Sequence, residues 1–274
     1  MKPDFIGITP GRSGTAWTHN CFIEHPRLCV PYKTINYFSE ESKFSRGDDW
    51  YENHFRTCSR EQVIGEISNY LDSEVAARRI FEYHSAVKLL IFLRNPVDRA
   101  FASYENELAS GAISATTRFE DAVEQRSQYL ERGFYHEGLK RYFELFPREQ
   151  ICIRIYEEGV RDPERYVREI FEFLDVDPAF EPSMLREWVS AGGVPRASAV
   201  TNAMNDVAEQ MRRMGLQNLI WIIKRSGLVK VVHKANRKSA PRPVTDEKRA
   251  ELADRFEQDM SATEQLLGID LSDW

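Results

Sequence analysis

Residues 5–17 of this sequence read Phe-Ile-Gly-Ile-Thr-Pro-Gly-Arg-Ser-Gly-Thr-Ala-Trp. The first four form a short apolar run that stops at Pro10 and Gly11, which predicts a buried strand ended by a turn. Residues 15–24 contain no helix breaker, and Pro26 follows them closely, so they predict a helix. The stretch therefore predicts a strand, a glycine-bearing loop and a helix in succession.

The same pattern recurs downstream. Apolar runs predict strands, and segments with helical spacing follow them; the strands are expected at 63–67, 87–93 and 151–155, and the helices at 73–83, from 97 onward, at 137–146 and from 163 onward. Strands that alternate with helices indicate an α/β fold of three layers, with a central, mainly parallel sheet flanked by helices. Ligands of such folds gather at the carboxyl ends of the strands.

The 274 residues are long enough for one large domain. The pattern changes at 191–195, Ala-Gly-Gly-Val-Pro, after which no strand is evident. We therefore expect a single domain over 1–274, with an α/β core at 1–190 and a helical extension at 191–274. Within the extension the sequence predicts helices at 199–214, 216–226 and 245–266 and a basic surface loop at 234–243.

Composition and charge restrict the class of partner. The chain is 42% hydrophobic and 29% charged, which is typical of a soluble globular protein. Its formal net charge of -6 argues against a nucleic-acid-binding protein, which would carry a positive field. Between Arg196 and Arg249, however, 12 lysines or arginines stand against 4 acidic residues. This stretch suits an anionic ligand, or else forms a solvated face.

Cysteine spacing and hydropathy bear on the compartment. The four cysteines, Cys21, Cys29, Cys58 and Cys152, form no CxxC pair and have apolar or aromatic neighbours, which predicts reduced, buried thiols without a disulfide framework or metal site. The N-terminus lacks the pattern of a signal peptide, and no apolar stretch approaches the ~20 residues of a membrane span. We therefore expect a cytoplasmic protein without a membrane span.

The loop after the first strand has the chemistry of an anion site. Where a strand turns into a helix, several backbone N–H groups lack intrahelical partners and point the same way. Arg12 adds a positive charge, Ser13 and Thr15 can donate hydroxyl hydrogen bonds, and Gly14 lets the backbone approach closely. A Walker A loop requires GxxxxGK[ST], which does not occur here. For this segment alone, a capped turn with incidental glycines is the alternative.

Arg94 stands at the end of the strand predicted at 87–93, beside a helix that begins near Val97. The planar fork of its guanidinium could bind a second phosphate at the edge of the sheet. Two structural roles are equally compatible with the position, namely an ion pair with Asp98 or a cap of the turn.

Residues 10–17 resemble the 5′-phosphosulfate loop of sulfotransferases that use 3′-phosphoadenosine 5′-phosphosulfate (PAPS), which commonly reads Pro-Lys/Arg-Ser/Thr-Gly-Thr-Thr-Trp. This chain has one extra glycine, and alanine replaces one threonine. The resemblance implies a P-loop-like donor site in which Arg12 contacts the bridging and sulfuryl oxygens. It also implies that the donor is bound by Ser13, Gly14, Thr15, Ala16 and Trp17.

The segment from Arg94 resembles the 3′-phosphate strand-loop-helix of the same family, in which an arginine and a serine hold that phosphate. Arg94 matches the arginine, whereas the usual place of the serine holds Ala102 and a serine follows at Ser103. Residues 193–196 resemble the loop that closes over the nucleotide in bacterial members, which implies a donor contact by Arg196. Further likenesses to the heparan-sulfate-type and related bacterial enzymes lie at 33–38, 49–51, 65–68 and 133–135.

The general base is the open point of this comparison. Lys33 is a candidate second cation near the sulfur, but the position after it, where heparan-type members commonly carry a glutamate, holds Thr34. Glu66, at the end of the second predicted strand, is the first substitute, unless it only orients Arg12 or Lys33 by an ion pair. His19, on the first helix, is the second, unless it is a structural histidine; an amine acceptor would need no base.

Taken with the resemblance, the sequence predicts an enzyme that transfers the sulfuryl group of PAPS to a hydroxyl or amine of a small-molecule or carbohydrate acceptor. The product would be 3′-phosphoadenosine 5′-phosphate (PAP), and no metal is expected. The alternatives are a nucleotide-dependent phosphotransferase and a noncatalytic nucleotide-binding protein of the same fold. Aromatic residues that would line an acceptor pocket, or else belong to the core, are Tyr37, Phe38, Trp50 and Tyr51.

Overall fold

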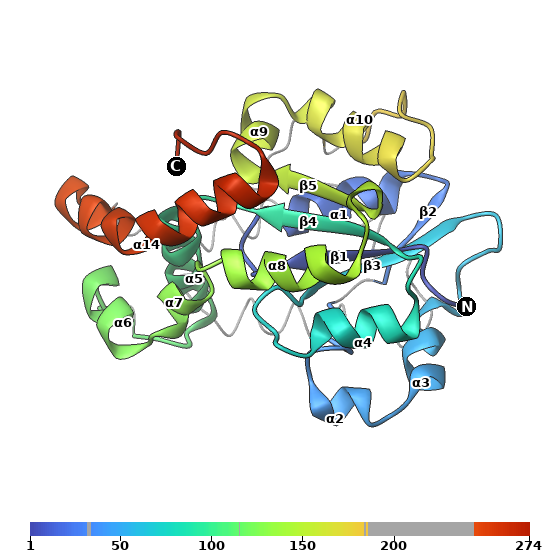
Figure 1. The fold of residues 1–274 in the computed structure, drawn as a ribbon, viewed down its shortest axis with the longest axis horizontal. Coiled ribbons are helices and arrows are strands. Elements are labelled where there is room, and N and C mark those ends of the chain that lie inside the picture. The colour runs from blue at the N-terminus through green and yellow to red at the C-terminus, as the bar shows by residue number, and fades with distance from the viewer. Residues whose placement is uncertain (32–33, 115, 184, 186–243) are drawn as a thin grey trace. The chain divides into compact units, whose positions relative to one another are not determined.

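The structure is a computed structural model that describes residues 1–31, 34–114, 116–183, 185 and 244–274. In this part of the chain five strands form one sheet in the order β2-β3-β1-β4-β5, and every neighbouring pair is parallel (Figure 1). The strands are β1 (Phe5–Thr9), β2 (Leu28–Cys29), β3 (Val63–Asn69), β4 (Lys88–Leu93) and β5 (Ile151–Ile155). The predicted α/β fold with a parallel sheet is confirmed.

Helices follow most strands, as the sequence predicts. The helices and 3-10 turns of the described residues are α1 (Thr15–Glu24), α2 (Glu41–Phe44), α3 (Asp48–Glu52), η1 (Asn53–Phe55), α4 (Ala76–Tyr83), α5 (Pro96–Ser110), α6 (Phe119–Gln125), α7 (Gln128–Glu131), α8 (His136–Leu145), η2 (Arg148–Gln150), α9 (Tyr156–Arg161), α10 (Pro163–Phe173) and α14 (Asp246–Leu267). The helices expected at 199–214 and 216–226 and the loop at 234–243 lie outside the described residues.

The sheet is buried on both faces because side chains alternate along each strand. On β4, Leu89, Ile91 and Leu93 belong to one core cluster, while Leu90 and Phe92 belong to another. Helices α4 and α8 cover the first face, and α1 and α10 cover the second (Figure 1). This arrangement explains why the apolar run of β4 is nearly continuous.

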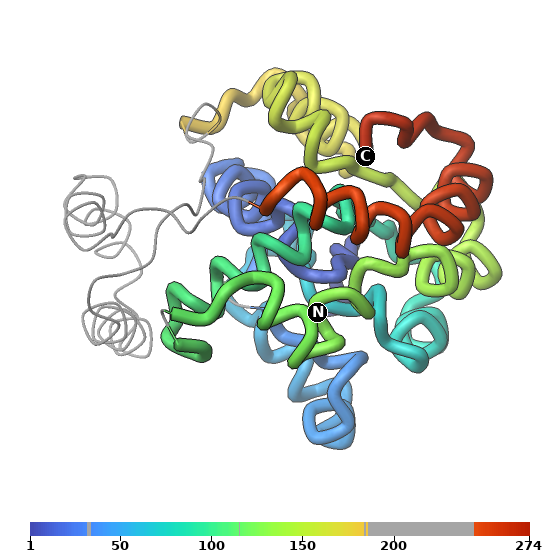
Figure 2. Tube along the Cα trace, turned by 90° about the vertical axis from the view of Figure 1, so that its left-hand side faces the viewer, coloured from blue at the N-terminus to red at the C-terminus, as the bar shows by residue number. Residues whose placement is uncertain are grey.

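The chain divides into two compact units. The first comprises residues 1–100, 127–189 and 249–274 and carries the sheet. Within it, α14 runs beside α8 (Figure 2), and the Asp259 carboxylate accepts hydrogen bonds from the amides of Tyr135, at 2.7 Å, and His136, at 3.2 Å. Most of α14 thus packs with the α/β core, while the division at 190 and 191 stays a prediction.

The second unit comprises residues 101–126 and 190–248. In its described part, the Tyr104 hydroxyl donates to the Thr117 carbonyl at 2.8 Å, and Arg126 pairs with Glu107 at 2.7 Å. These bonds tie the loop after α5, together with α6, back to the C-terminal half of α5.

The cysteines require a correction. Cys29 and Cys58 form a disulfide, with Cα atoms 5.7 Å apart, so the prediction of four reduced thiols is wrong for this pair. The chain before β3 returns beside the short strand β2, which brings together two cysteines that are 29 residues apart and show no spacing signature. Cys21 and Cys152 are free, and burial raises the pKa of Cys21 to about 12.

Candidate functional site

The loop between β1 and α1 turns its backbone through the left-handed region three times. Gly11 has φ 82, Arg12 has φ 65 and Gly14 has φ 78, and the Gly11 amide donates to Thr9 Oγ1 at 3.0 Å. Alternation of left-handed and right-handed residues turns successive amides inward and forms an anion-binding concavity. The loop follows the central strand of the sheet, at its carboxyl edge.

The start of α1 adds further donors. Gly14 occupies the N-cap without a side-chain cap, and its carbonyl accepts the first helical hydrogen bond from the Trp17 amide at 3.0 Å. The amides that precede this bond have no helical carbonyl to pair with. The Ser13 side chain is fully buried, and its Oγ makes no hydrogen bond within the described residues. A buried hydroxyl without a partner is uncommon, and a bound ion or water is one way in which such a group is satisfied.

Arg94 reaches the same edge from β4, which neighbours β1. Its Nη1 donates to the Arg12 carbonyl at 3.2 Å, and its guanidinium carbon lies 4.2 Å from the centre of the Tyr156 ring. Its Nε is buried and finds no acceptor in the described part of the chain. A second polar group that lacks a partner therefore lies beside the loop.

Both structural roles that the sequence allowed for Arg94 belong to other residues. Asp98 pairs with Arg249, with Oδ1 and Nη2 2.5 Å apart. The turn is capped by Asn95, whose Oδ1 accepts from the amides of Val97 at 2.9 Å and Asp98 at 3.1 Å. Arg94 instead contacts the Arg12 carbonyl and the Tyr156 ring, and phosphate binding by Arg94 stays a prediction.

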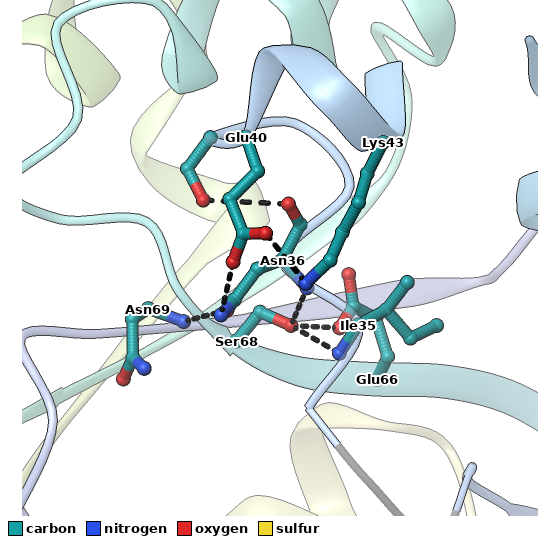
Figure 3. A network of polar contacts seen from close by, with 8 residues as sticks. Ile35, Asn36, Glu40, Lys43, Glu66, Ser68 and Asn69 are labelled. Carbon is teal, nitrogen blue, oxygen red and sulfur yellow. Dashed lines mark hydrogen bonds and ion pairs between the residues drawn. The ribbon is translucent and has the colours of Figure 1, made fainter. Parts of the chain in front are cut away.

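Glu66 lies inside a polar network in the middle of β3, which continues to Asn69, and not at the end of the strand as the sequence predicts (Figure 3). It is 1% exposed and accepts hydrogen bonds from Tyr70 at 2.6 Å, from Tyr51 at 3.2 Å and from Ser68. Burial raises the pKa of Glu66, although the hydrogen bonds from the three hydroxyls act in the opposite direction. The carboxylate is therefore engaged by three hydroxyl donors within the core.

The same network anchors the segment after β2. Ser68 Oγ accepts from the amides of Ile35 at 3.1 Å and Asn36 at 3.0 Å. The Asn36 side chain accepts from the Asn69 amide at 3.0 Å and donates to Glu40 at 3.0 Å (Figure 3). Glu66 thus acts through Ser68 on the stretch that begins just after Lys33 and Thr34.

Other residues singled out from the sequence take varied positions. Thr34 is exposed, and Lys33 and Arg196 lie outside the described residues. The Nε2 of His19 lies 2.7 Å from the Pro31 carbonyl. Because a carbonyl oxygen only accepts, this nitrogen carries the proton, and a role as a base would fall to Nδ1.

The remaining loop residues differ in exposure. Thr15 is half-buried and Ala16 is exposed at the start of α1, whereas the Trp17 indole is 2% exposed and packs in the core against Tyr166. Ser103 lies on the part of α5 that belongs to the second unit, so its contact with the 3′-phosphate stays a prediction.

The sequence allows two roles, in the core or in an acceptor pocket, for four aromatic residues. Three of them belong to the core. Tyr37, Phe38 and Tyr51 are at most 1% exposed, and the rings of Tyr37 and Tyr51 stack with centres 4.6 Å apart. Trp50 is half-buried at the margin of this cluster.

Sequence reasoning missed two residues at the end of β5. Tyr156 covers Gly14 and faces Arg94, and Glu157 Oε1 accepts from the Asn95 amide at 3.0 Å. A signal existed, because both directly follow a predicted strand, at the edge where ligands of parallel sheets bind.

No group of three or more histidine, cysteine, aspartate or glutamate side chains among the described residues is arranged to hold a metal ion. None of the helices in this part of the chain combines the length and apolarity needed to cross a membrane.

Fold and site together define an α/β protein with two candidate anion-binding elements at neighbouring strand ends. A sequence profile of the sulfotransferase domain matches residues 2–191, which is more than half of the chain. The chain belongs to the sulfotransferase family. A crystal structure of a sulfotransferase from Alicyclobacillus acidocaldarius superposes with a TM-score of 0.73 at 24% identity, over 100% of this chain and 99% of that one, and confirms the fold.

Curated relatives modify heparan sulfate. The human bifunctional heparan sulfate N-deacetylase/N-sulfotransferase 2 is 26% identical over 196 residues, which cover 64% of this chain and 22% of that protein. The mouse heparan sulfate glucosamine 3-O-sulfotransferase 5 is 26% identical over 188 residues, or 65% of this chain and 54% of that protein. The similarity thus spans about a fifth of the first relative and about half of the second.

Proposed function

We propose that this chain is a PAPS-dependent sulfotransferase that transfers a sulfuryl group to a hydroxyl or amine of a small-molecule or carbohydrate acceptor. One observation carries the proposal: two elements suited to bind anions stand at the ends of β1 and β4 and are joined by the hydrogen bond from Arg94 to the Arg12 carbonyl. PAPS has phosphates at both ends of its ribose, whereas ATP has a single polyphosphate chain. A site with two separated phosphate elements therefore suits PAPS better.

The residues present fit this donor, because the buried Ser13 Oγ and Arg94 Nε make no hydrogen bond with described residues. In the proposal, the 5′-phosphosulfate is bound by backbone amides in the first turn of α1, including that of Ala16. The hydroxyls of Ser13 and Thr15 bind the same group. Arg12 places a positive charge where the leaving phosphate gains negative charge. The Trp17 indole supports the helix from the core, and bound PAPS supplies the sulfuryl group.

The donor contacts of four further residues rest on the family resemblance. Arg94 and Ser103 would hold the 3′-phosphate, Lys33 would be a second cation near the sulfur, and Arg196 would close over the nucleotide. Carbohydrate acceptors are suggested by the relatives, whose names refer to heparan sulfate. A cytoplasmic location stays a proposal, and the disulfide counts against it because reducing compartments keep thiols reduced.

The contacts of Glu66 and His19 bear on which of the two could act as a general base. Because three hydroxyls already engage the buried Glu66, we propose that it positions the segment around Asn36 instead of accepting a proton from an acceptor. His19 then becomes the candidate base for a hydroxyl acceptor, through Nδ1. An amine acceptor could react without either residue.

Calorimetry tests the donor assignment. The wild-type protein should bind PAP in preference to ATP and ADP, and Arg94→Ala should weaken PAP binding by about 10- to 100-fold, the range expected for loss of hydrogen bonds to a charged group. The matched control is Arg78→Ala, because this arginine is highly exposed on α4, where it pairs with Glu82. Equal affinity for ATP and PAP would overturn the proposal in favour of a phosphotransferase.

Turnover tests the catalytic part of the proposal. PAP release from PAPS should be measured with a panel of hydroxyl and amine acceptors, and Arg12→Ala should reduce the rate through loss of charge stabilisation. Sulfation of no acceptor despite tight PAP binding would favour the noncatalytic alternative. Unchanged turnover in Arg12→Ala would remove Arg12 from the mechanism.

A further inference from the structure

Tyr156, the first residue after β5, contacts both phosphate-binding elements. A Cβ atom built on Gly14 would lie 2.5 Å from Tyr156 Cδ2, so the ring covers this glycine without room for a side chain. The Arg94 guanidinium carbon lies 4.2 Å from the centre of the same ring. One aromatic ring therefore touches the loop at the end of β1 and the arginine at the end of β4.

The next residue, Glu157, fixes the backbone beside Arg94. Its Oε1 accepts from the Asn95 amide at 3.0 Å. Burial raises the pKa of Glu157, while the hydrogen bond from Asn95 and the charge of Arg94 act against this rise. The start of α9 thus contacts the side chain of Arg94 and the backbone of the residue that follows it.

The position of the Arg94 guanidinium over the Tyr156 ring bears on how it can bind phosphate. Its donors lie in one plane and project from its edge, so a ring against its face fixes the plane while the edge can still donate. Without the ring, the flexible side chain of Arg94 would sample several rotamers and lose entropy on binding. The ring therefore prepares Arg94 for an anion.

We propose that Tyr156 is a positioning residue that sets the preference of the donor site for a 3′-phosphorylated nucleotide, by holding the Arg94 guanidinium at a fixed place relative to the Gly14 loop. This inference rests on the proposed function and deepens its donor site. The ring acts through Arg94, whereas the Gly14 loop provides the contacts to the 5′-phosphate.

Two nucleotides that differ only in the 3′-phosphate, PAP and adenosine 5′-monophosphate, separate this role from simple packing. Their affinities are measured by calorimetry for the wild type, Tyr156→Phe and Tyr156→Leu. In Tyr156→Leu the affinity for PAP should fall about 3- to 30-fold, the range of a desolvated cation–π contact, while the affinity for adenosine 5′-monophosphate changes less than about 2-fold. Tyr156→Phe keeps the ring and should retain the preference for PAP.

Each outcome has a distinct meaning. The inference would be overturned if the ratio of the two affinities in Tyr156→Leu stayed at the wild-type value. If both affinities fell by the same factor, Tyr156 would have a packing role alone. A wild-type protein without preference for PAP would instead overturn the proposed function. If Tyr156→Leu does not fold, Tyr156→Met fills a similar volume without a ring and allows the same comparison.

Discussion

Gly14 is the residue on which the geometry of the phosphate loop depends most directly. It combines φ 78 with the Tyr156 ring at 2.5 Å from the place of a Cβ atom, so both backbone and space demand glycine. Its neighbour Arg12 adopts φ 65 with a side chain present, which costs about 1 kcal/mol relative to ordinary backbone. The strain is consistent with a backbone arranged for binding, since such residues cluster at functional sites.

Gly14→Ala should destabilise the protein by about 1–3 kcal/mol, because alanine is strained at positive φ and its methyl group overlaps the Tyr156 ring. It should also weaken PAP and adenosine 5′-monophosphate alike, since it displaces the loop itself. Chemical denaturation and calorimetry measure the two effects.

The matched control for this change is Gly268→Ala. Gly268, directly after α14, has φ 65, but no atom lies within 4 Å of its added Cβ, so alanine there carries the backbone cost alone. A loss of stability in Gly14→Ala no larger than that in Gly268→Ala would show that the Tyr156 ring moves aside easily.

At the scale of elements, the two ends of α1 serve different contacts. Its N-terminus carries the phosphate loop, and its C-terminal end holds the segment after α10. Glu24 accepts from the Ser183 amide at 2.5 Å and from its hydroxyl at 2.9 Å. His25, just after the helix, is 1% exposed and packs between the rings of Phe171 and Phe180.

His25 should make stability depend on pH. Its Nδ1 accepts from the Arg27 amide at 3.1 Å, so Nε2 carries the proton and donates to the Asp177 carbonyl at 3.2 Å. Burial lowers the pKa of His25 below 6.5, with opposing effects from Asp177 and a small further lowering by the charge of Arg27. The unfolded chain is therefore protonated first, and stability that is present above pH 6.5 is lost as the pH falls through the lower folded pKa.

Urea unfolding at a series of pH values checks this expectation. The decline in midpoint between about pH 7.5 and 5.5, the range around an ordinary histidine pKa, should be smaller in His25→Gln than in the wild type. His54→Gln, at an exposed position, is the control and should leave the change of the unfolding midpoint with pH as it is in the wild type. If the unfolding midpoint declined equally with pH in all three proteins, His25 would be excluded as the cause of the pH dependence.

The sequence predicts the long elements well because apolar runs and breakers coincide with them. The strand at 151–155 and the helix at 15–24 have the predicted bounds. Strand β2, with two residues, and α2, with four, are too short to leave a periodic signal. The disulfide and the packing of Tyr156 depend on segments that meet only in the folded chain, so local pattern does not contain them.

At the scale of the molecule, the disulfide constrains the unfolded chain. It links β2, the edge strand of the sheet, to the residue three positions after η1, and closes a separation of 29 residues. In the chain-entropy model such a cross-link stabilises the fold by about 3 kcal/mol. It also holds the edge strand directly before the segment that Ser68 and Asn36 anchor to β3.

Reduction of this bond should therefore lower the free energy of unfolding by about 3 kcal/mol. Denaturation with and without a reductant measures the difference, and the double variant Cys29→Ala with Cys58→Ala should show no effect of the reductant. Thiol titration of the denatured, unreduced protein should detect only Cys21 and Cys152. Four titratable thiols, or an unfolding midpoint insensitive to reductant, would contradict the assignment.

The strand order has a consequence for how such a protein can diversify. The described donor-site residues follow β1, β4 and β5, whereas the segment at 30–36 begins the connection between the two strands on the other side of β1. Asn36 and Ser68 fasten that segment at a defined point. The two sides of β1 are therefore anchored separately, and we expect chains of this fold to vary the connection after β2 without changing the backbone of the loop at Gly14.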